Sequence, residues 1–338
     1  MEMKMDEIAK LSKKERELLF RETASIKGVA PEIVEKDFWV CWTLKQLFSL
    51  PSIKEHIVFK GGTTLSKVFG VIERFSEDID LIMDWRLIGL DKEPYIHRTR
   101  TQQERFNEKT NEEAAEYIKN SILPLLDNVL PGKCKNISVS LHNDNKWGLN
   151  VKCEEVFREN YIRPEVLLEI GPLGSWIPND EYKIKPYCAE IFPDKFKLNE
   201  CIVRAVKIER TFWEKITILH QEAHRSDKKN ISARYSRHYY DVFRMKLLGI
   251  EKTAFKDIGL LDSVRVFKQK FYPCSWAKYE NAKPGTMKLL PFSNKHLKEL
   301  RDDYSRMKVM IFGEYPKFDA VIQEMKVLED EINNLKSK

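Results

Sequence analysis

The chain has 338 residues, a formal net charge of +6, 33% charged residues and a hydrophobic fraction of 42%. This composition is typical of a folded protein that can bury one large core or two smaller ones. No apolar run reaches the ~18 residues that a transmembrane helix needs, so we expect no membrane partner. The excess of basic residues favours a polyanionic partner such as RNA, although charge alone does not establish one.

The cysteines are scattered and include no Cys-x-x-Cys pair, so the sequence indicates neither a zinc site nor a disulfide framework. They are Cys41, Cys134, Cys153, Cys188, Cys201 and Cys274. Residues 1–7 contain no apolar signal core. We therefore expect a reduced, cytoplasmic location.

The first 200 residues predict a small mixed sheet flanked by helices. Two helices are expected between residues 5 and 50, the second beginning at Pro31, which is favoured in a first helical turn. Strands are expected at 57–59, 78–83, 137–141, 148–153 and 165–171. Further helices are expected at 63–69 and 104–129, with a basic loop at 86–105.

From Val203 onward the pattern is helical. Helices are expected at 208–223, 235–248, 294–312 and 318–335, with an irregular stretch at 264–291. The whole chain thus predicts an α+β protein with two domains. Residues 1–200 would form the α/β domain, and residues 201–338 would form a helical domain that completes an active-site cleft.

The segment between the first two strands carries the residues most informative about chemistry. Gly61 and Gly62 make a tight turn before a short helix, and free backbone N–H groups at a helix N-terminus suit phosphate. Asp78 and Asp80 lie two residues apart on a strand, so their side chains point to the same side. Carboxylates held this close suit Mg²⁺, and a metal beside a phosphate cradle is equipment for nucleotidyl transfer. A solvated acidic strand end is the competing interpretation.

A third carboxylate would complete a metal site of this kind. Glu169 is the first candidate, because it lies on a strand opposite the face of its apolar neighbours. Glu165 shares that face but lies at the start of the strand, beside Pro164. A strand glutamate that simply faces solvent explains the same pattern.

These motifs resemble the Gly-Gly/Ser and Asp-x-Asp signature of the polymerase-beta-like nucleotidyltransferase superfamily. More narrowly, residues 59–67 and 74–81 are similar to the AbiEii/AbiGii toxin family, the toxin half of type IV toxin–antitoxin systems. Similarity at 35–38 and 307–314 extends the resemblance over most of the chain. It implies a polymerase-beta-like mixed sheet flanked by helices, followed by a mainly helical half.

The resemblance adds two residues from the second half of the chain. Lys215 matches the family's downstream lysine, which belongs to the active site and would stabilise charge on a triphosphate. Asp241 matches the aspartate of the closing Arg-x-x-Tyr-Asp motif, and would orient Lys215 or the acceptor hydroxyl. A local ion pair with Arg237, four residues earlier on the expected helix, is the competing explanation for Asp241.

The residue pattern and the resemblance together give the candidate site residues. The catalytic residues would be Asp78, Asp80, Lys215 and Asp241. The nucleotide would be bound by Gly62, Thr63, Lys67 and Lys215. Mg²⁺, or alternatively Mn²⁺, would be held by Asp78, Asp80 and Glu169.

The function that the resemblance implies is a toxin acting in phage defence. The enzyme would transfer a nucleoside monophosphate from an NTP to an RNA acceptor, the 3′ end of tRNA, and so block translation. A separately encoded antitoxin would be its partner without having to touch it. Two alternatives stay open: a nucleotidyltransferase that is not a toxin and modifies a small molecule or protein, and a non-enzymatic RNA-binding module. The second alternative would not need both Asp78 and Asp80.

Overall fold

The computed structural model describes most of the chain in two compact units. The described residues are 4–89, 95–157, 163, 165–196, 200–291 and 293–336. The first unit comprises residues 1–68 and 76–206, and the second comprises residues 69–75 and 207–338. The short segment 69–75 therefore belongs with the C-terminal half, which the sequence did not predict.

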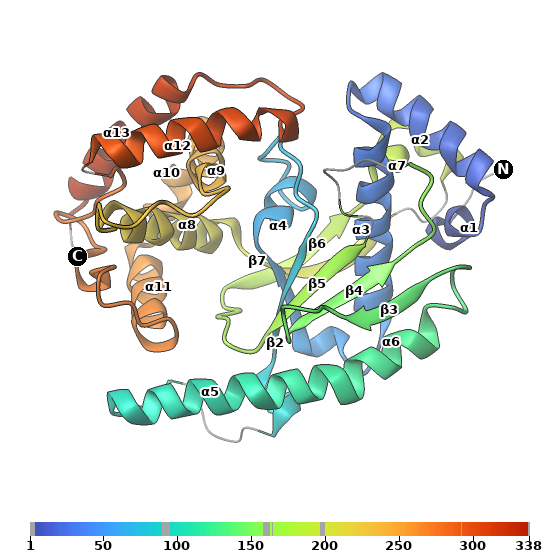
Figure 1. The fold of residues 1–338 in the computed structure, drawn as a ribbon, viewed down its shortest axis with the longest axis horizontal. Coiled ribbons are helices and arrows are strands. Elements are labelled where there is room, and N and C mark those ends of the chain that lie inside the picture. The colour runs from blue at the N-terminus through green and yellow to red at the C-terminus, as the bar shows by residue number, and fades with distance from the viewer. Residues whose placement is uncertain are drawn as a thin grey trace. The chain divides into compact units, whose positions relative to one another are not determined.

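The first unit is built on a seven-stranded mixed sheet with the strand order β3-β4-β5-β2-β1-β7-β6 (Figure 1). The strands are β1 Ile57–Lys60, β2 Ile79–Met83, β3 Ser138–Leu141, β4 Gly148–Lys152, β5 Val166–Gly171, β6 Asn179–Ile184 and β7 Cys201–Val206. β2 pairs antiparallel with β1 and parallel with β5, so it occupies the centre of the sheet. The central strands are rich in fully buried apolar residues, as expected for strands covered by helices.

Seven helices flank this sheet among the described residues of the first unit. They are α1 Met5–Ala9, α2 Lys13–Lys27, α3 Pro31–Ser49, α4 Gly62–Lys67, α5 Arg100–Tyr117, α6 Leu123–Val129 and α7 Tyr187–Ile191. A π-helical turn, Ile118–Ile122, joins α5 to α6, and short 3-10 turns occur at Lys54–His56, Trp85–Ile88 and Pro193–Lys195. α3 packs against β5 and β7 and is buried along most of its length, which makes it the central helix of the unit (Figure 1).

The second unit is helical in its described residues. Its helices are α8 Ile208–Ala223, α9 Ser236–Leu247, α10 Ile250–Ala254, α11 Ile258–Phe271, α12 Asn294–Met307 and α13 Phe318–Asn333, with 3-10 turns at Tyr279–Asn281 and Lys308–Met310. α8 and α9 contact each other, and α12 and α13 both pack on α9. Segment 69–75 joins this unit through a bridge between Arg74 and Ile311 and a bond from Phe75 N to the Met310 carbonyl.

The observed fold confirms the predicted α+β class, with corrections to several elements. Cys201–Val206 is strand β7 rather than the start of the helical half, and β6 was not predicted at all. A division at residue 200 would cut the antiparallel pairing of β6 with β7. The predicted loop 86–105 ends earlier, because α5 begins at Arg100, and it includes residues 90–94, which lie outside the described residues.

Two further predicted elements differ from the structure in smaller ways. The first helical stretch is interrupted between α1 and α2, where Ser12 caps the second helix. The stretch 264–291 is less irregular than predicted, since α11 runs to Phe271. Within the described residues, no helix is long and apolar enough to cross a membrane.

Candidate active site

Charged residues of the first unit form a row across three neighbouring strands. Asp80 on β2 lies opposite Lys60 on β1 and is paired with Glu169 on β5. Paired residues of neighbouring strands place their side chains on the same face of the sheet. The register therefore brings two carboxylates and one cation together at the centre of the sheet. It also places Glu169, rather than Glu165, beside Asp80.

The electrostatics of Asp80 reflect this crowding. Burial raises the pKa of Asp80, the charge of Lys60 opposes the rise, and Glu169 and Asp78 add to it, so that the pKa reaches about 7. Asp80 and Glu169 share a hydrogen bond, and Asn145 Nδ2 donates a second one to Glu169 Oε1 at 2.9 Å. Two carboxylates close enough to share a hydrogen bond are stabilised by a shared proton or by a neighbouring cation.

Gly61 is required by its own backbone and by the approach of Asp80. Its φ angle is +86°, and a Cβ atom built there would lie 1.9 Å from Asp80 Oδ2. Residues with a side chain rarely adopt this positive-φ conformation. A Cβ atom at this position would also overlap the carboxylate oxygen of Asp80. The glycine turn between β1 and α4 thus makes room for the carboxylate.

Thr63 connects this turn to the segment before β2. Its hydroxyl donates a 2.6 Å hydrogen bond to the Asp78 carbonyl and lies 3.0 Å from Ser76 Oγ. The Thr63 side chain is buried, so its hydroxyl forms hydrogen bonds within the protein. The predicted nucleotide ligands Gly62 and Thr63 are the first two residues of α4, and the Thr63 side chain fixes the backbone at Asp78.

Lys67 lies in an internal ion pair. Its ammonium is 2.6 Å from Asp37 Oδ1 and 4.0 Å from the centre of the Tyr187 ring. Its side chain is 4% exposed. The sequence predicted that Lys67 binds the triphosphate, but in the structure its charge is used to satisfy Asp37. We therefore assign no phosphate contact to it.

The donor chemistry of the carboxylate row suits a hard divalent cation. Asp78, Asp80 and Glu169 offer oxygen atoms, and positive charge beside them would offset both the burial and the neighbouring carboxylates that raise the pKa of Asp80. In the described part of the chain, no three His, Cys, Asp or Glu side chains converge into a complete metal-binding group. A cation here would therefore share its coordination with water and phosphate, as Mg²⁺ usually does.

A second charged cluster lies inside the second unit. Arg74 donates two hydrogen bonds to Asp241, from Nε to Oδ1 at 2.6 Å and from Nη2 to Oδ2 at 2.7 Å. Lys215 Nζ lies 2.7 Å from Asp241 Oδ2, so α8 and α9 bring together two residues that are 26 positions apart in the sequence. Both oxygens of Asp241 are satisfied by distant residues, and its burial needs no local pair with Arg237.

This cluster carries two cations and one carboxylate. Burial alone would raise the pKa of Asp241, but Arg74 and Lys215 outweigh it and hold the pKa well below its ordinary value. His238 Nδ1 lies 3.5 Å from Lys215 Nζ, and burial followed by the charge of Lys215 lowers the pKa of His238 well below 6.5. Burial lowers the pKa of Lys215 as well, Asp241 opposes this shift, and the charge of Arg74 adds to it.

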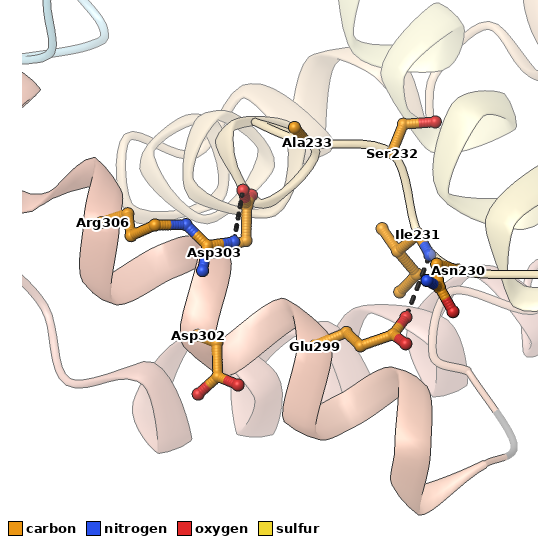
Figure 2. Close-up of a pocket in the computed structure, with 8 residues that line it drawn as sticks. All are labelled: Asn230, Ile231, Ser232, Ala233, Glu299, Asp302, Asp303 and Arg306. Carbon is orange, nitrogen blue, oxygen red and sulfur yellow. Dashed lines mark hydrogen bonds and ion pairs between the residues drawn. The ribbon is translucent and has the colours of Figure 1, made fainter.

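A pocket of about 210 Å³ lies in the second unit between the segment 230–233 and α12 (Figure 2). Two of its carboxylates hold backbone N–H groups: Glu299 accepts from Ile231 at 3.0 Å, and Asp303 accepts from Arg234 at 2.7 Å. Asp303 also accepts from Ser236, the first residue of α9. The lining of the pocket includes none of the predicted site residues. The bonds of Asp303 instead hold the backbone at the start of α9.

Sequence reasoning missed Lys60, Arg74 and Asn145 as participants. Lys60 and Arg74 lie inside the two motifs that carried the resemblance, and Lys60 directly precedes Gly61. Their partners depend on strand register and helix packing, which local spacing does not reveal. Asn145 lies between the strands expected at 137–141 and 148–153, and nothing in its local sequence indicates its bond to Glu169.

Comparison with known proteins places the chain in a family. Residues 42–324, well over half of the chain, match the model of the family described as nucleotidyl transferase AbiEii toxin, type IV TA system. The chain belongs to the AbiEii family. It is therefore a nucleotidyltransferase toxin of a type IV toxin–antitoxin system, and the resemblance found in the sequence is confirmed.

A similar solved structure is MenT4, a nucleotidyltransferase toxin from Mycobacterium tuberculosis H37Rv. It is 14% identical, with a TM-score of 0.37, and the match covers 93% of this chain and 99% of that chain. No curated protein matches the chain. The roles of individual AbiEii residues in this chain, and the joint action of its two charged clusters, stay predictions.

Proposed function

We propose that this AbiEii protein uses Mg²⁺ to transfer a nucleoside monophosphate from an NTP to the 3′ end of an RNA, with pyrophosphate as the leaving group. The observation that carries the proposal is the pairing of Asp80 with Glu169 beside Lys60, together with the raised pKa of Asp80. Asp78, Asp80 and Glu169 would hold the metal, and Mn²⁺ offers the same coordination chemistry. Bound Mg²⁺ would supply positive charge to the phosphate oxygens.

The remaining residues divide the work of binding and charge stabilisation. Gly62 and Thr63 would approach the triphosphate through their backbone, since the Thr63 hydroxyl is already bonded to Asp78. Lys215 would offset the negative charge that develops on the phosphates. The low pKa of Asp241 makes it a poor proton acceptor, which favours orienting Lys215 over activating the acceptor hydroxyl.

The acceptor we propose is the 3′ end of tRNA, as the family resemblance implies, and its modification would block translation in the cytoplasm. The net charge of +6 supports a polyanionic acceptor. Exposed Arg105 on α5 and exposed Arg234 before α9 are available to contact its phosphates. The antitoxin would be encoded separately, and the proposal requires no contact with it.

The direct test is incorporation of label. The protein is incubated with each labelled NTP, Mg²⁺ and total tRNA, and label in RNA is measured with wild-type protein, with Asp80→Asn and with EDTA. Label that enters RNA only with wild-type protein and metal supports the proposal. Label that enters a small molecule or a protein instead would exclude the RNA acceptor, and label that survives EDTA or Asp80→Asn would exclude the metal site.

A binding measurement separates the acceptor from the nucleotide. Charge reversal of Arg105 and Arg234 should weaken RNA binding and flatten its dependence on salt by about one unit of slope per lost phosphate contact. Lys133→Glu, an exposed cation outside the motifs, serves as the matched control. NTP binding should be nearly unchanged in all three. Equal loss of NTP and RNA binding would indicate misfolding, and unchanged RNA binding would argue against an RNA acceptor.

A further inference from the structure

Three consecutive charged residues are buried in α3, the central helix of the first unit. Glu35, Lys36 and Asp37 are 6%, 4% and 6% exposed. Successive helical side chains are ~100° apart, so the three point in different directions and cannot share one solvent-facing side. Charged side chains are almost never buried to this degree unless they are paired, and each of these three has partners in a different part of the unit.

Lys36 is bonded to the segments that carry two of the predicted metal ligands. Its ammonium lies 3.3 Å from Glu77 Oε2 and donates to the carbonyls of Arg163, at 2.7 Å, and Glu165. Glu77 is the residue immediately before Asp78, and Glu165 immediately precedes β5, the strand of Glu169. Glu77 also accepts from Arg163 N at 3.3 Å, which closes the connection between the two segments.

The residues on either side of Lys36 hold further segments of the same unit. Asp37 accepts from Tyr187 N at 2.7 Å and pairs with Lys67, the last residue of the helix that begins at Gly62. Glu35 accepts from the N–H groups of residues 156 and 157, which follow β4. One turn of α3 thus contacts the glycine-turn helix, the segment before β2 and the segment before β5.

Stability alone does not explain this arrangement. Replacing a buried ion pair with apolar residues of similar size is often neutral or stabilising, because the charges lose their hydration on burial. Residues 75–78 lie outside the helices and strands, and isolated bonds, such as that from the Thr63 hydroxyl to the Asp78 carbonyl, set their path in place of a regular ladder. A charged anchor with defined donors and acceptors fixes that path where an apolar contact would allow it to shift.

We propose that Lys36 is a positioning residue of the nucleotidyltransferase reaction. It holds Glu77 and the entry to β5 so that Asp78 and Glu169 are presented beside Asp80. The inference deepens the proposed function, since it rests on these carboxylates forming the metal site. Removing a group that orients a metal ligand typically lowers metal affinity or activity by about 10–100-fold.

The test removes the pair without leaving a buried charge. Lys36→Met combined with Glu77→Gln keeps the local net charge unchanged and retains an acceptor for Arg163 N. The matched control is Arg16→Met: Arg16 is 1% exposed and donates to Ala9 O, Glu154 O and Glu154 Oε2 within the same unit. Thermal stability, Mn²⁺ affinity by electron paramagnetic resonance, and kcat and KM for the NTP are measured for each protein.

The double variant should bind Mn²⁺ about 10–100-fold more weakly and lose kcat by a similar factor, while KM for the NTP changes less. Arg16→Met should lose stability but keep Mn²⁺ affinity and kcat per folded molecule. A double variant within about twofold of wild type in both Mn²⁺ affinity and kcat overturns the inference, as does an equal catalytic loss in Arg16→Met. If wild-type protein transfers no nucleotide to RNA, the proposed function fails, and Mn²⁺ affinity still decides the role of Lys36.

Discussion

Each unit holds a carboxylate whose pKa is shifted, and the two pKa values are shifted in opposite directions. In the first unit, Asp80 meets a second carboxylate, Glu169, and its pKa is raised to about 7. In the second unit, Asp241 lies between Arg74 and Lys215, and its pKa is lowered. Asp241 is satisfied by two cations of the protein, whereas Asp80 shares a hydrogen bond with a second carboxylate, so this pair needs a shared proton or a neighbouring cation.

We interpret the Asp80–Glu169 pair as an arrangement that binds a ligand. We interpret the Asp241 cluster as a structural arrangement that also holds the functional residue Lys215. Carboxylates crowded together cost stability and are kept where they bind a cation. The Asp241 cluster instead pairs its carboxylate with two cations of the protein, Arg74 and Lys215. Substitutions should therefore affect activity without stability in the first unit, and stability together with activity in the second.

The largest effect is expected for Asp80→Asn. Removal of one metal ligand should lower nucleotide transfer by about 1,000-fold or more. The same change removes repulsion with Glu169, so metal-free protein should be as stable as wild type or more stable. Transfer assays and thermal unfolding in EDTA measure the two quantities. A strongly destabilised Asp80→Asn protein would break the contrast between the two units.

Asp241→Ala should act in the opposite sense on stability. It leaves Arg74 and Lys215 buried without their carboxylate, and breaking a buried pair in this way costs about 3–5 kcal/mol. Urea denaturation at neutral pH measures the loss. A variant as stable as wild type would show that the cluster is more hydrated than its burial indicates.

Lys215→Met sharpens the comparison within the second unit. Asp241 keeps both hydrogen bonds from Arg74, so the free energy of unfolding should change by only about 1–2 kcal/mol. Transfer should still fall by about 100-fold, because the positive charge of Lys215 is lost. Steady-state kinetics beside the unfolding curves test this. Activity near wild type would remove Lys215 from the chemistry.

The smallest expected effect is the loss of stability at acidic pH that the buried His220 causes. His220 accepts from Lys288 N and bonds the Lys278 carbonyl, and burial lowers its pKa from 6.5 to about 4. The unfolded chain therefore binds a proton between about pH 6.5 and 4 that the folded chain does not, so stability falls as pH falls through this window. The contribution from pH 7 to pH 5 is about 2 kcal/mol. His220→Gln should lose that part of the pH dependence in urea titrations, and an unchanged slope would contradict the assignment.

Much of the local structure followed from the sequence. The glycine turn, the Asp-x-Asp strand and the helices around Lys215 and Asp241 lie where spacing predicted them, because alternation and helical periodicity are properties of neighbouring residues. β7 was missed because a short apolar run that leads directly into a helix has no period of its own. β6 was missed because Asn179–Glu181 are poor strand formers at the sheet edge.

Sequence by itself determined the family, the enzyme class and the candidate residues, since these depend on residue types at short spacings. Tertiary structure alone decided which charges meet. It placed Glu169 rather than Glu165 beside Asp80, paired Lys67 with Asp37, and joined Arg74 to Asp241 across 167 positions. Such pairs depend on strand register and helix packing, and the free energy of burying a charge is set by neighbours that the local sequence does not contain.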